Sequence, residues 1–288
     1  MVCRVMHTGA WLRRRRATVA ALLLSSSVVI ALVLSSAGGA ACAAMRSTAA
    51  FVPAPREPRV RYEPGAELAA ETVAAALPGA IDTVERALGG RFEEPPPVFV
   101  CATLATFAEY AGSPRAGGHT RAGRVFISPK PENTPERLPR VLTHELVHLY
   151  FEQHAGALAS ARHIPPWFGE GLAALVSGAG AEQVSEGEAA RAIAEGRRIE
   201  PKEEGSLFGR DLGPGAGLSV HMFYRQGAML VGFLRDGDPH AFADLLRALE
   251  DGAWFGAAFE RSYHAPLGAW WQRFVAAAPA RAALDAPR

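Results

Sequence analysis

Three residues with the chemistry of a metal site lie close together near the middle of the chain. They are His144, Glu145 and His148, in the pattern His-Glu-x-x-His. On an α-helix, residues four apart lie on the same face, so both histidines can bind one metal ion, for which zinc is the first candidate. Glu145 lies near that ion without binding it, where it can accept a proton from a water molecule and pass it to a leaving amine.

The residues around this motif predict a buried helix, because most of the stretch 141–151 is apolar. Charged groups within such a stretch are costly to bury unless something compensates them, and a metal ion would do so. The alternative is a chance match on a core helix whose histidines bond to the backbone. A third ligand elsewhere in the chain would favour the metal site.

A candidate third ligand is Glu170, in the sequence Trp-Phe-Gly-Glu-Gly at 167–171. Pro166 suits the first turn of a helix, and the apolar residues that follow recur at helical spacing. Glu170 is therefore expected on the first or second turn of a second helix. A catalytic zinc site usually has three protein ligands and one open position, and His144, His148 and Glu170 would supply the three ligands.

With these two motifs the chain resembles the gluzincin zinc metallopeptidases, specifically their peptidase MA-like branch. In that branch the His-Glu-x-x-His helix is followed by a Trp-x-x-Glu-Gly helix that carries the third ligand, and residues 167–171 match this pattern. The resemblance covers residues 60–278, strongly over 141–175 and loosely elsewhere. It implies one zinc ion per chain and hydrolysis of peptide bonds with Glu145 as the general base.

His154 is a rival third ligand, because it completes the spacing His-Glu-x-x-His-x5-His. The metzincin peptidases place a histidine there, but they need a glycine three residues after the second histidine, where this chain has Phe151. On an unbroken helix His154 would lie about 9 Å farther along the axis than His148 and away from its face. This geometry favours Glu170, and a metzincin-like peptidase that uses His154 is the alternative.

A group that stabilises the oxyanion of the reaction is expected farther along the chain. Gluzincins often use a downstream tyrosine for this hydrogen bond. Tyr224 begins the sequence Tyr-Arg-Gln-Gly-Ala, which resembles the family's Tyr-x-x-Gly/Ala helix. A core tyrosine would have the same pattern, and His221, one turn earlier, is the substitute candidate.

The resemblance implies an α+β fold of the thermolysin-like, gluzincin type, in which a small mixed β-sheet packs on a mainly helical half with the active-site helix between them. The sequence pattern predicts a helix over 67–88 and a strand over 98–101. By resemblance, a strand over 123–128 forms the edge of the cleft, where a peptide substrate pairs with it. Residues 117–120 are expected to form a loop, whose His119 could line the cleft. Later helices are predicted over 182–198, 219–234, 239–249, 255–263 and 267–274.

An export signal is expected at the N-terminus. Residues 1–44 contain an arginine cluster at 13–16, an apolar run over 17–34 and then small residues, the order typical of such a signal. The rest of the chain is predicted to consist of a Pro/Arg-rich linker, a catalytic domain and a flexible tail, over 45–65, 66–278 and 279–288.

The sequence leaves three fates open for this signal. Cys42 ends a weak lipobox, with Gly39 where a lipoprotein signal normally has Leu, and lipid attachment there would tether the protein to a membrane. Cleavage after an Ala-x-Ala site is the second fate. Retention as an anchor is the third, since a run of about eighteen apolar residues is near the minimum that spans a bilayer. Each fate places the folded domain in the cell envelope, on the periplasmic or extracytoplasmic side.

Charge and cysteine content exclude some kinds of partner. Residues 1–42 hold five of the 30 Lys and Arg residues and no acidic residue, so the remainder has 25 against 29 acids, a formal charge of −4. No basic patch indicates nucleic acid. Cys101 is expected as a buried thiol, and the three cysteines predict no disulfide framework. The expected partners are a peptide or protein substrate and, through the N-terminal segment, a membrane; the oligomeric state is not indicated.

The function expected from these features is that of an exported zinc-dependent metallopeptidase. The chain lacks the Gly-x-Met-Glu-Asn motif with which the aminopeptidase branch holds a free N-terminus, and this favours an endopeptidase. The alternative from another class is an inactive MA-like envelope protein that keeps the fold as a binding module. Glu145 argues against that alternative, because a structural zinc site needs no base.

Overall fold

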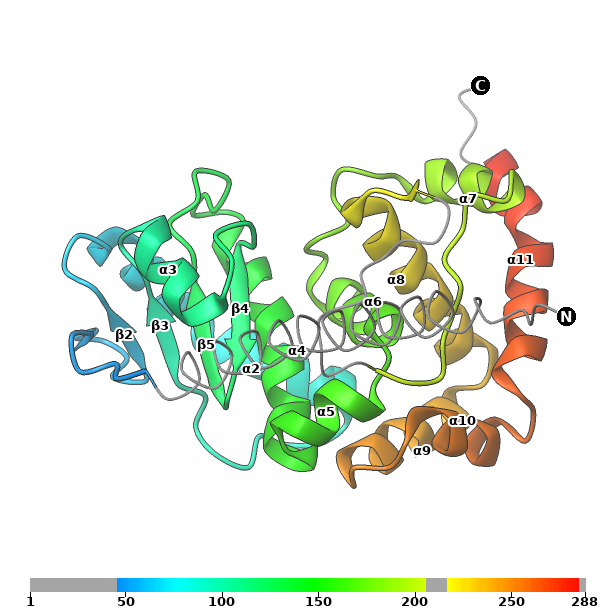
Figure 1. Ribbon diagram of the computed structural model, residues 1–288, viewed down its shortest axis with the longest axis horizontal. Helices are drawn as coiled ribbons and strands as arrows, with labels where there is room; N and C mark the ends of the chain where they lie inside the picture. Colours follow the sequence, from blue (N-terminus) through cyan, green and yellow to red (C-terminus); the bar gives the residue numbers. More distant parts are fainter. Residues whose placement is uncertain (1–45, 206–216, 285–288) are drawn as a thin grey trace, which may run out of the picture. The chain divides into compact units, whose positions relative to one another are not determined.

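A five-stranded mixed sheet forms one side of the computed structural model, which describes residues 46–205 and 217–284 (Figure 1). Strands β2, β3 and β5 run parallel, whereas β1 and β4 pair antiparallel with β2 and β5 at the two edges. In sheet order the strands are β1 (Val52–Pro53), β2 (Val60–Tyr62), β3 (Val98–Val100), β5 (Arg124–Ile127) and β4 (Gly118–Arg121).

Helices cover both faces of this sheet and form the other half of the structure (Figure 1). The fold is therefore α+β, mainly helical with a small mixed sheet, and the predicted class is confirmed at that level. The helices are α2 (Glu67–Leu88), α3 (Leu104–Ala111), α4 (Leu138–Ala155), α5 (Ala157–His163), α6 (Pro166–Ser177), α7 (Glu186–Ala194), α8 (Val220–Gly237), α9 (Pro239–Glu250), α10 (Phe255–Tyr263) and α11 (Leu267–Leu284).

Strand β3 shows how the sheet separates two apolar clusters. Side chains alternate between the faces of a strand, so Val98 and Val100 join the large core with α2 and α4. Phe99 and Cys101 point to the other face, where α3 packs. Cys101 is buried as predicted, and burial raises the pKa of its thiol to about 12. A thiol with such a pKa stays protonated at neutral pH and is unreactive.

The prediction of a linker over 45–65 is wrong for the described part of that stretch. β1 and β2 are strands of the sheet, and Phe51 is only 1% exposed. The Phe51 ring packs edge-on against Phe99 and Tyr110, with centroids 5.3 and 5.6 Å apart. These strands are too short to show an alternating pattern, and the residues that bury them lie far along the chain. The local sequence therefore shows only its many Pro and Arg residues, which suggested a linker.

Two prolines lie inside helices that continue past them. α2 runs through Pro78 as predicted, and α11 runs through Pro279 to Leu284. The predicted tail over 279–288 therefore begins inside a helix. Tertiary contacts support the last turns of α11, because Ala278 is buried and the Arg281 guanidinium lies 5.3 Å above the ring of Phe233.

The predicted export signal, with Cys42, lies outside the described residues. Among the helices that are described, none combines the length and apolar content that a membrane span requires.

Replacing Phe51 with alanine tests whether residues 46–65 belong to the fold. Because this large side chain is buried in the α3-side cluster, Phe51→Ala should lower the free energy of unfolding by about 3–5 kcal/mol. Val52→Ala is the matched control, since Val52 is 41% exposed and its change should stay within about 0.5 kcal/mol. Equally small effects in chemical denaturation would contradict the packing of this stretch.

Candidate metal centre

Helix α4 carries the His-Glu-x-x-His motif between the sheet and the helical half. It contacts α2, β4 and β5 on the sheet side and α6 on the other side. Because α4 is enclosed in this way, His144 and Glu145 are only 7% and 5% exposed, and His148 is half-buried. The buried helix predicted from the apolar run is confirmed.

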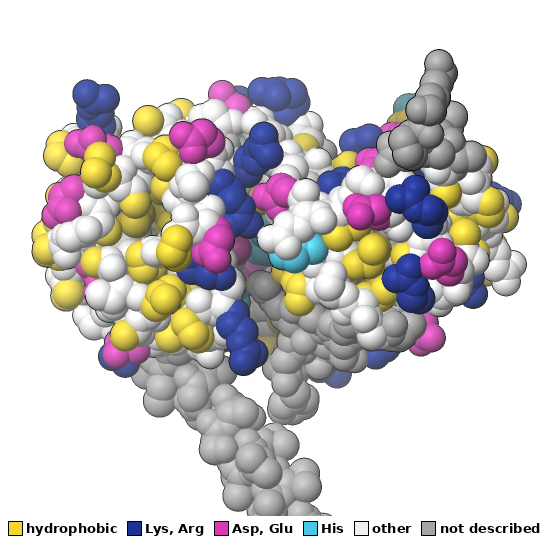
Figure 2. All heavy atoms as spheres, turned by 90° about the horizontal axis from the view of Figure 1, so that it is seen from above, with side chains coloured by type: hydrophobic (Ala, Val, Ile, Leu, Met, Phe, Trp, Pro, Cys, Tyr) yellow, Lys and Arg dark blue, Asp and Glu magenta, His cyan; other side chains and the backbone are white. Residues whose placement is uncertain are grey.

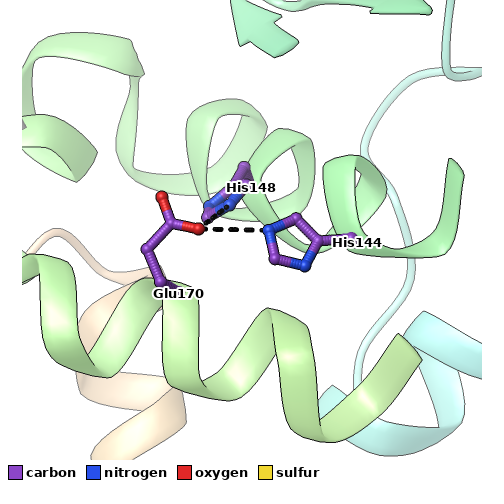
Figure 3. Close-up of side chains that lie close together, drawn as sticks. All are labelled: His144, His148 and Glu170. Atoms are coloured by element: carbon purple, nitrogen blue, oxygen red, sulfur yellow. Dashed lines mark hydrogen bonds and ion pairs between the residues drawn. The ribbon is translucent and has the colours of Figure 1, made fainter. Parts of the chain in front are cut away.

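Helix α6 brings the third predicted ligand to this motif. Pro165 is extended, Pro166 opens the helix, and Glu170 lies on its second turn, as predicted. Glu170 is 3% exposed, and its Oε2 lies 3.1 Å from His144 Nε2 and 3.5 Å from His148 Nε2 (Figure 3). One possible ligand atom from each of the three residues lies within 4.8 Å of the other two.

The geometry of this group fits a zinc ion. Ligands about 2.0–2.1 Å from a tetrahedral zinc ion lie about 3.3 Å from one another, close to the two contacts of Glu170 Oε2. Two imidazoles and a carboxylate are also a donor set that zinc accepts.

The Glu145 side chain lies against strand β4. The hydroxyl of Thr120 lies 2.8 Å from the backbone oxygen of Glu145 and 3.0 Å from its Oε2. Gly118 packs against the same side chain, since a Cβ at that position would lie 2.7 Å from Glu145 Cγ. Glu145 lies on the same helix as His144 and His148, but it does not belong to the group of possible metal ligands.

β4 is the edge strand on the side of the sheet next to β5, and two strand predictions need correction. Residues 118–121 form a strand instead of the predicted loop, and the strand over 124–127, predicted as the cleft edge, lies inside the sheet between β3 and β4. The short Gly-His-Thr-Arg run has no apolar alternation, so its pairing was not evident. Since Thr120 faces α4, strand alternation directs His119 to the opposite face, away from the ligand group.

The turn between β4 and β5 is held against α4 by the half-buried carboxylate of Glu152. Gly123 N–H donates to Glu152 Oε2 at 2.8 Å. Burial raises the pKa of the Glu152 carboxyl above its ordinary value, whereas this N–H and the nearby His148 and Arg121 lower it. At the other end of β4, Asn133 Nδ2 donates to Gly117 O at 2.7 Å.

His154 does not join the ligand group. It lies near the end of α4, where its Nδ1 donates to Tyr150 O at 2.9 Å and its ring stacks on Tyr150 with centroids 4.2 Å apart. The group of possible ligand atoms contains Glu170 in its place.

Helix α8 places Tyr224 next to the ligand group. The Tyr224 ring stacks on His144, with centroids 5.8 Å apart and planes inclined by 22°. Gly180, at φ 86°, leaves room for this ring, because a Cβ there would lie 2.4 Å from Tyr224 Cδ2. His221, the substitute candidate, instead donates from Nδ1 to Gly180 O at 2.8 Å and so holds the loop after α6.

The glycines of the two downstream motifs allow α6 and α8 to cross in backbone contact. A Cβ on Gly171 would lie 2.5 Å from the carbonyl carbon of Gly227, and a Cβ on Gly227 would lie 2.8 Å from Trp167 O. This crossing explains why a glycine follows Glu170 directly and why another follows Tyr224 by three residues.

Sequence reasoning missed several residues that shape the site. Gly118 and Thr120 alternate along β4, and an Ala-Gly turn follows them; this hairpin signal could have been found. Gln226 is fully buried on α8, accepting from Ile199 N and donating to Arg197 O, both at 2.9 Å. In the sequence, Gln226 could have been identified only as a polar residue within an apolar helical stripe.

Compared with known proteins, the chain matches no family model and no curated protein. Any functional reading therefore depends on the motifs and on the site geometry. The space-filling view shows a hollow between the two halves of the structure, with histidine at its wall (Figure 2).

Substituting the glycine after Glu170 tests the α6–α8 crossing. Gly171→Ala should lower the free energy of unfolding by about 1–3 kcal/mol, because the new methyl group meets the α8 backbone. Gly169→Ala is the matched control on the same helix, since its Cβ would meet only Ile164 Cγ2 at 3.7 Å. In Gly169→Ala, the helix preference of alanine should raise the free energy of unfolding by up to about 1 kcal/mol. Thermal and chemical unfolding would measure both, and a Gly171→Ala chain as stable as the control would refute the close approach.

Proposed function

We propose that this protein is a zinc-dependent metallopeptidase of gluzincin type. The observation that carries the proposal is the group of His144, His148 and Glu170, whose possible ligand atoms lie within 4.8 Å of one another. Glu145, a residue that could act as a base, lies beside this group on the same helix. The motifs that the chain shares with gluzincins support the same reading.

The three ligand residues would hold one zinc ion, which would lower the pKa of a water molecule and polarise a scissile carbonyl. Glu145 would accept a proton from the attacking water and return it to the departing amine. Tyr224, stacked on His144, is the candidate donor to the oxyanion. This division of roles needs no protein group beyond the three ligands, Glu145 and the tyrosine.

Strand β4 is the proposed binding edge for the peptide substrate. In its register with β5, Gly117 O accepts from Ser128 N, so the backbone groups of Gly118 and Thr120 point away from β5. A peptide can pair with such groups as an added strand. Because an extended peptide can run past both ends of a short strand, this mode suits an endopeptidase.

The proposed location is the cell envelope, on the extracytoplasmic side. It rests on the arginine cluster, apolar run and small residues over 1–44, with Cys42 as a possible point of lipid attachment. The membrane is the second proposed partner, reached through this segment.

Zinc content is the first test. The purified chain should hold about one zinc ion, Glu170→Ala should hold far less, and His154→Ala should keep the parent's content, because Glu170, and not His154, lies with the two histidines of the motif. Elemental analysis after reloading with zinc measures all three. A parent that binds no zinc would refute the peptidase and favour a scaffold used for binding. Loss of zinc with His154→Ala alone would instead support the metzincin-like arrangement.

Peptide cleavage is the second test. Glu145→Gln keeps the size of the side chain but cannot accept the proton, so cleavage of a peptide library should fall roughly 10²–10⁴-fold while zinc is retained. Mass spectrometry of the products would also separate internal cleavage from trimming of ends. A zinc-loaded parent that cleaves no more than Glu145→Gln would identify an inactive binding protein.

A further inference from the structure

Strand β4 lies beside both oxygens of the Glu145 carboxyl group. The Thr120 hydroxyl lies 3.0 Å from Oε2, and a Cβ on Gly118 would lie 3.1 Å from Oε1. Thr120 is 6% exposed and Glu145 is 5% exposed, so solvent does little to orient either group. The missing side chain of Gly118 therefore leaves room for one carboxyl oxygen, and the Thr120 hydroxyl makes a polar contact with the other.

The Thr120 contact also links the carboxyl group to its own helix. A threonine hydroxyl has one hydrogen, and here two oxygens of Glu145 lie within its reach, the backbone oxygen at 2.8 Å and Oε2 at 3.0 Å. The contact with the Glu145 backbone oxygen holds the Thr120 hydroxyl, which belongs to β4, at a fixed position relative to α4. From that place it constrains the rotation of the Glu145 side chain.

We propose that Thr120 is a positioning residue for Glu145, a role that rests on the peptidase function proposed above. The backbone N–H and C=O of the same residue point away from β5, toward the edge of the sheet where the substrate would pair. One residue thus relates the peptide to the base: its backbone places the scissile bond and its side chain places the carboxyl group. Loss of the hydroxyl alone should then impair turnover and leave substrate pairing intact.

Thr120→Val and Thr120→Ser in the full zinc-loaded chain test this role. Valine keeps the shape of threonine without the hydroxyl, so kcat should fall on the order of tenfold to hundredfold, as expected for a misplaced catalytic group. KM should stay within about twofold and zinc content should not change, because backbone pairing and the three ligands are untouched. Serine restores the hydroxyl and should recover most of kcat.

Three kinetic outcomes would overturn the proposal: an unchanged kcat in Thr120→Val, an effect confined to KM, or equal losses with valine and serine. If the parent cleaves no peptide, the proposed function fails, and the positioning role fails with it. A failure of the proposed function is seen as no cleavage by the parent. A failure of the positioning role alone is seen as an active parent whose Thr120 variants do not show the expected changes in kcat.

A second measurement does not depend on activity. In metal-free protein, the effects of Thr120→Val and Glu145→Gln on the unfolding midpoint should be non-additive when combined, because the two side chains touch. Additive effects would show that the contact does not exist in solution and would overturn the proposal, whatever the kinetics. Non-additivity together with the kcat loss and its recovery by serine would support it.

Discussion

The burial of one carboxylate, that of Glu170, is the constraint on which the rest of the site depends. At 3% exposure it has lost nearly all contact with bulk water, and an uncompensated buried charge would be strongly destabilising. His144 Nε2 and His148 Nε2 are the groups that face it, at 3.1 and 3.5 Å. The carboxylate can be compensated only if α6 lies against one particular face of α4, so the two motifs and the packing of their helices are interdependent.

Four glycines, which have no side chain, allow the surrounding elements to come close enough for this arrangement. Gly171 and Gly227 let the backbones of α6 and α8 touch, Gly180 admits the ring of Tyr224, and Gly118 admits the side chain of Glu145. Interiors are packed so densely that one additional methyl group at such contacts forces a displacement. Glycine at these places thus sets distances among three helices and one strand, and the chemistry proposed for the site requires those distances.

Strand β4 connects the sheet with the proposed chemistry. Asn133 holds its start, Thr120 contacts Glu145 in its middle, and Glu152 holds the turn that follows it. An edge strand usually presents unpaired backbone groups that invite pairing with another chain. Here the edge is short and anchored along its length, which suits a strand that receives a peptide in one register.

The sequence by itself determined the features that depend on neighbours along the chain. Helix spacing placed His144 and His148 on one face, and the proline at the start of α6 placed Glu170 on its first or second turn. The tertiary structure alone decided which strand is the edge, that Phe51 and its short strands join the sheet, and that α11 continues past Pro279. It also brought Thr120 to Glu145. These features depend on contacts between residues distant in sequence, whose burial and pairing partners leave no periodic signal in a stretch of three or four residues.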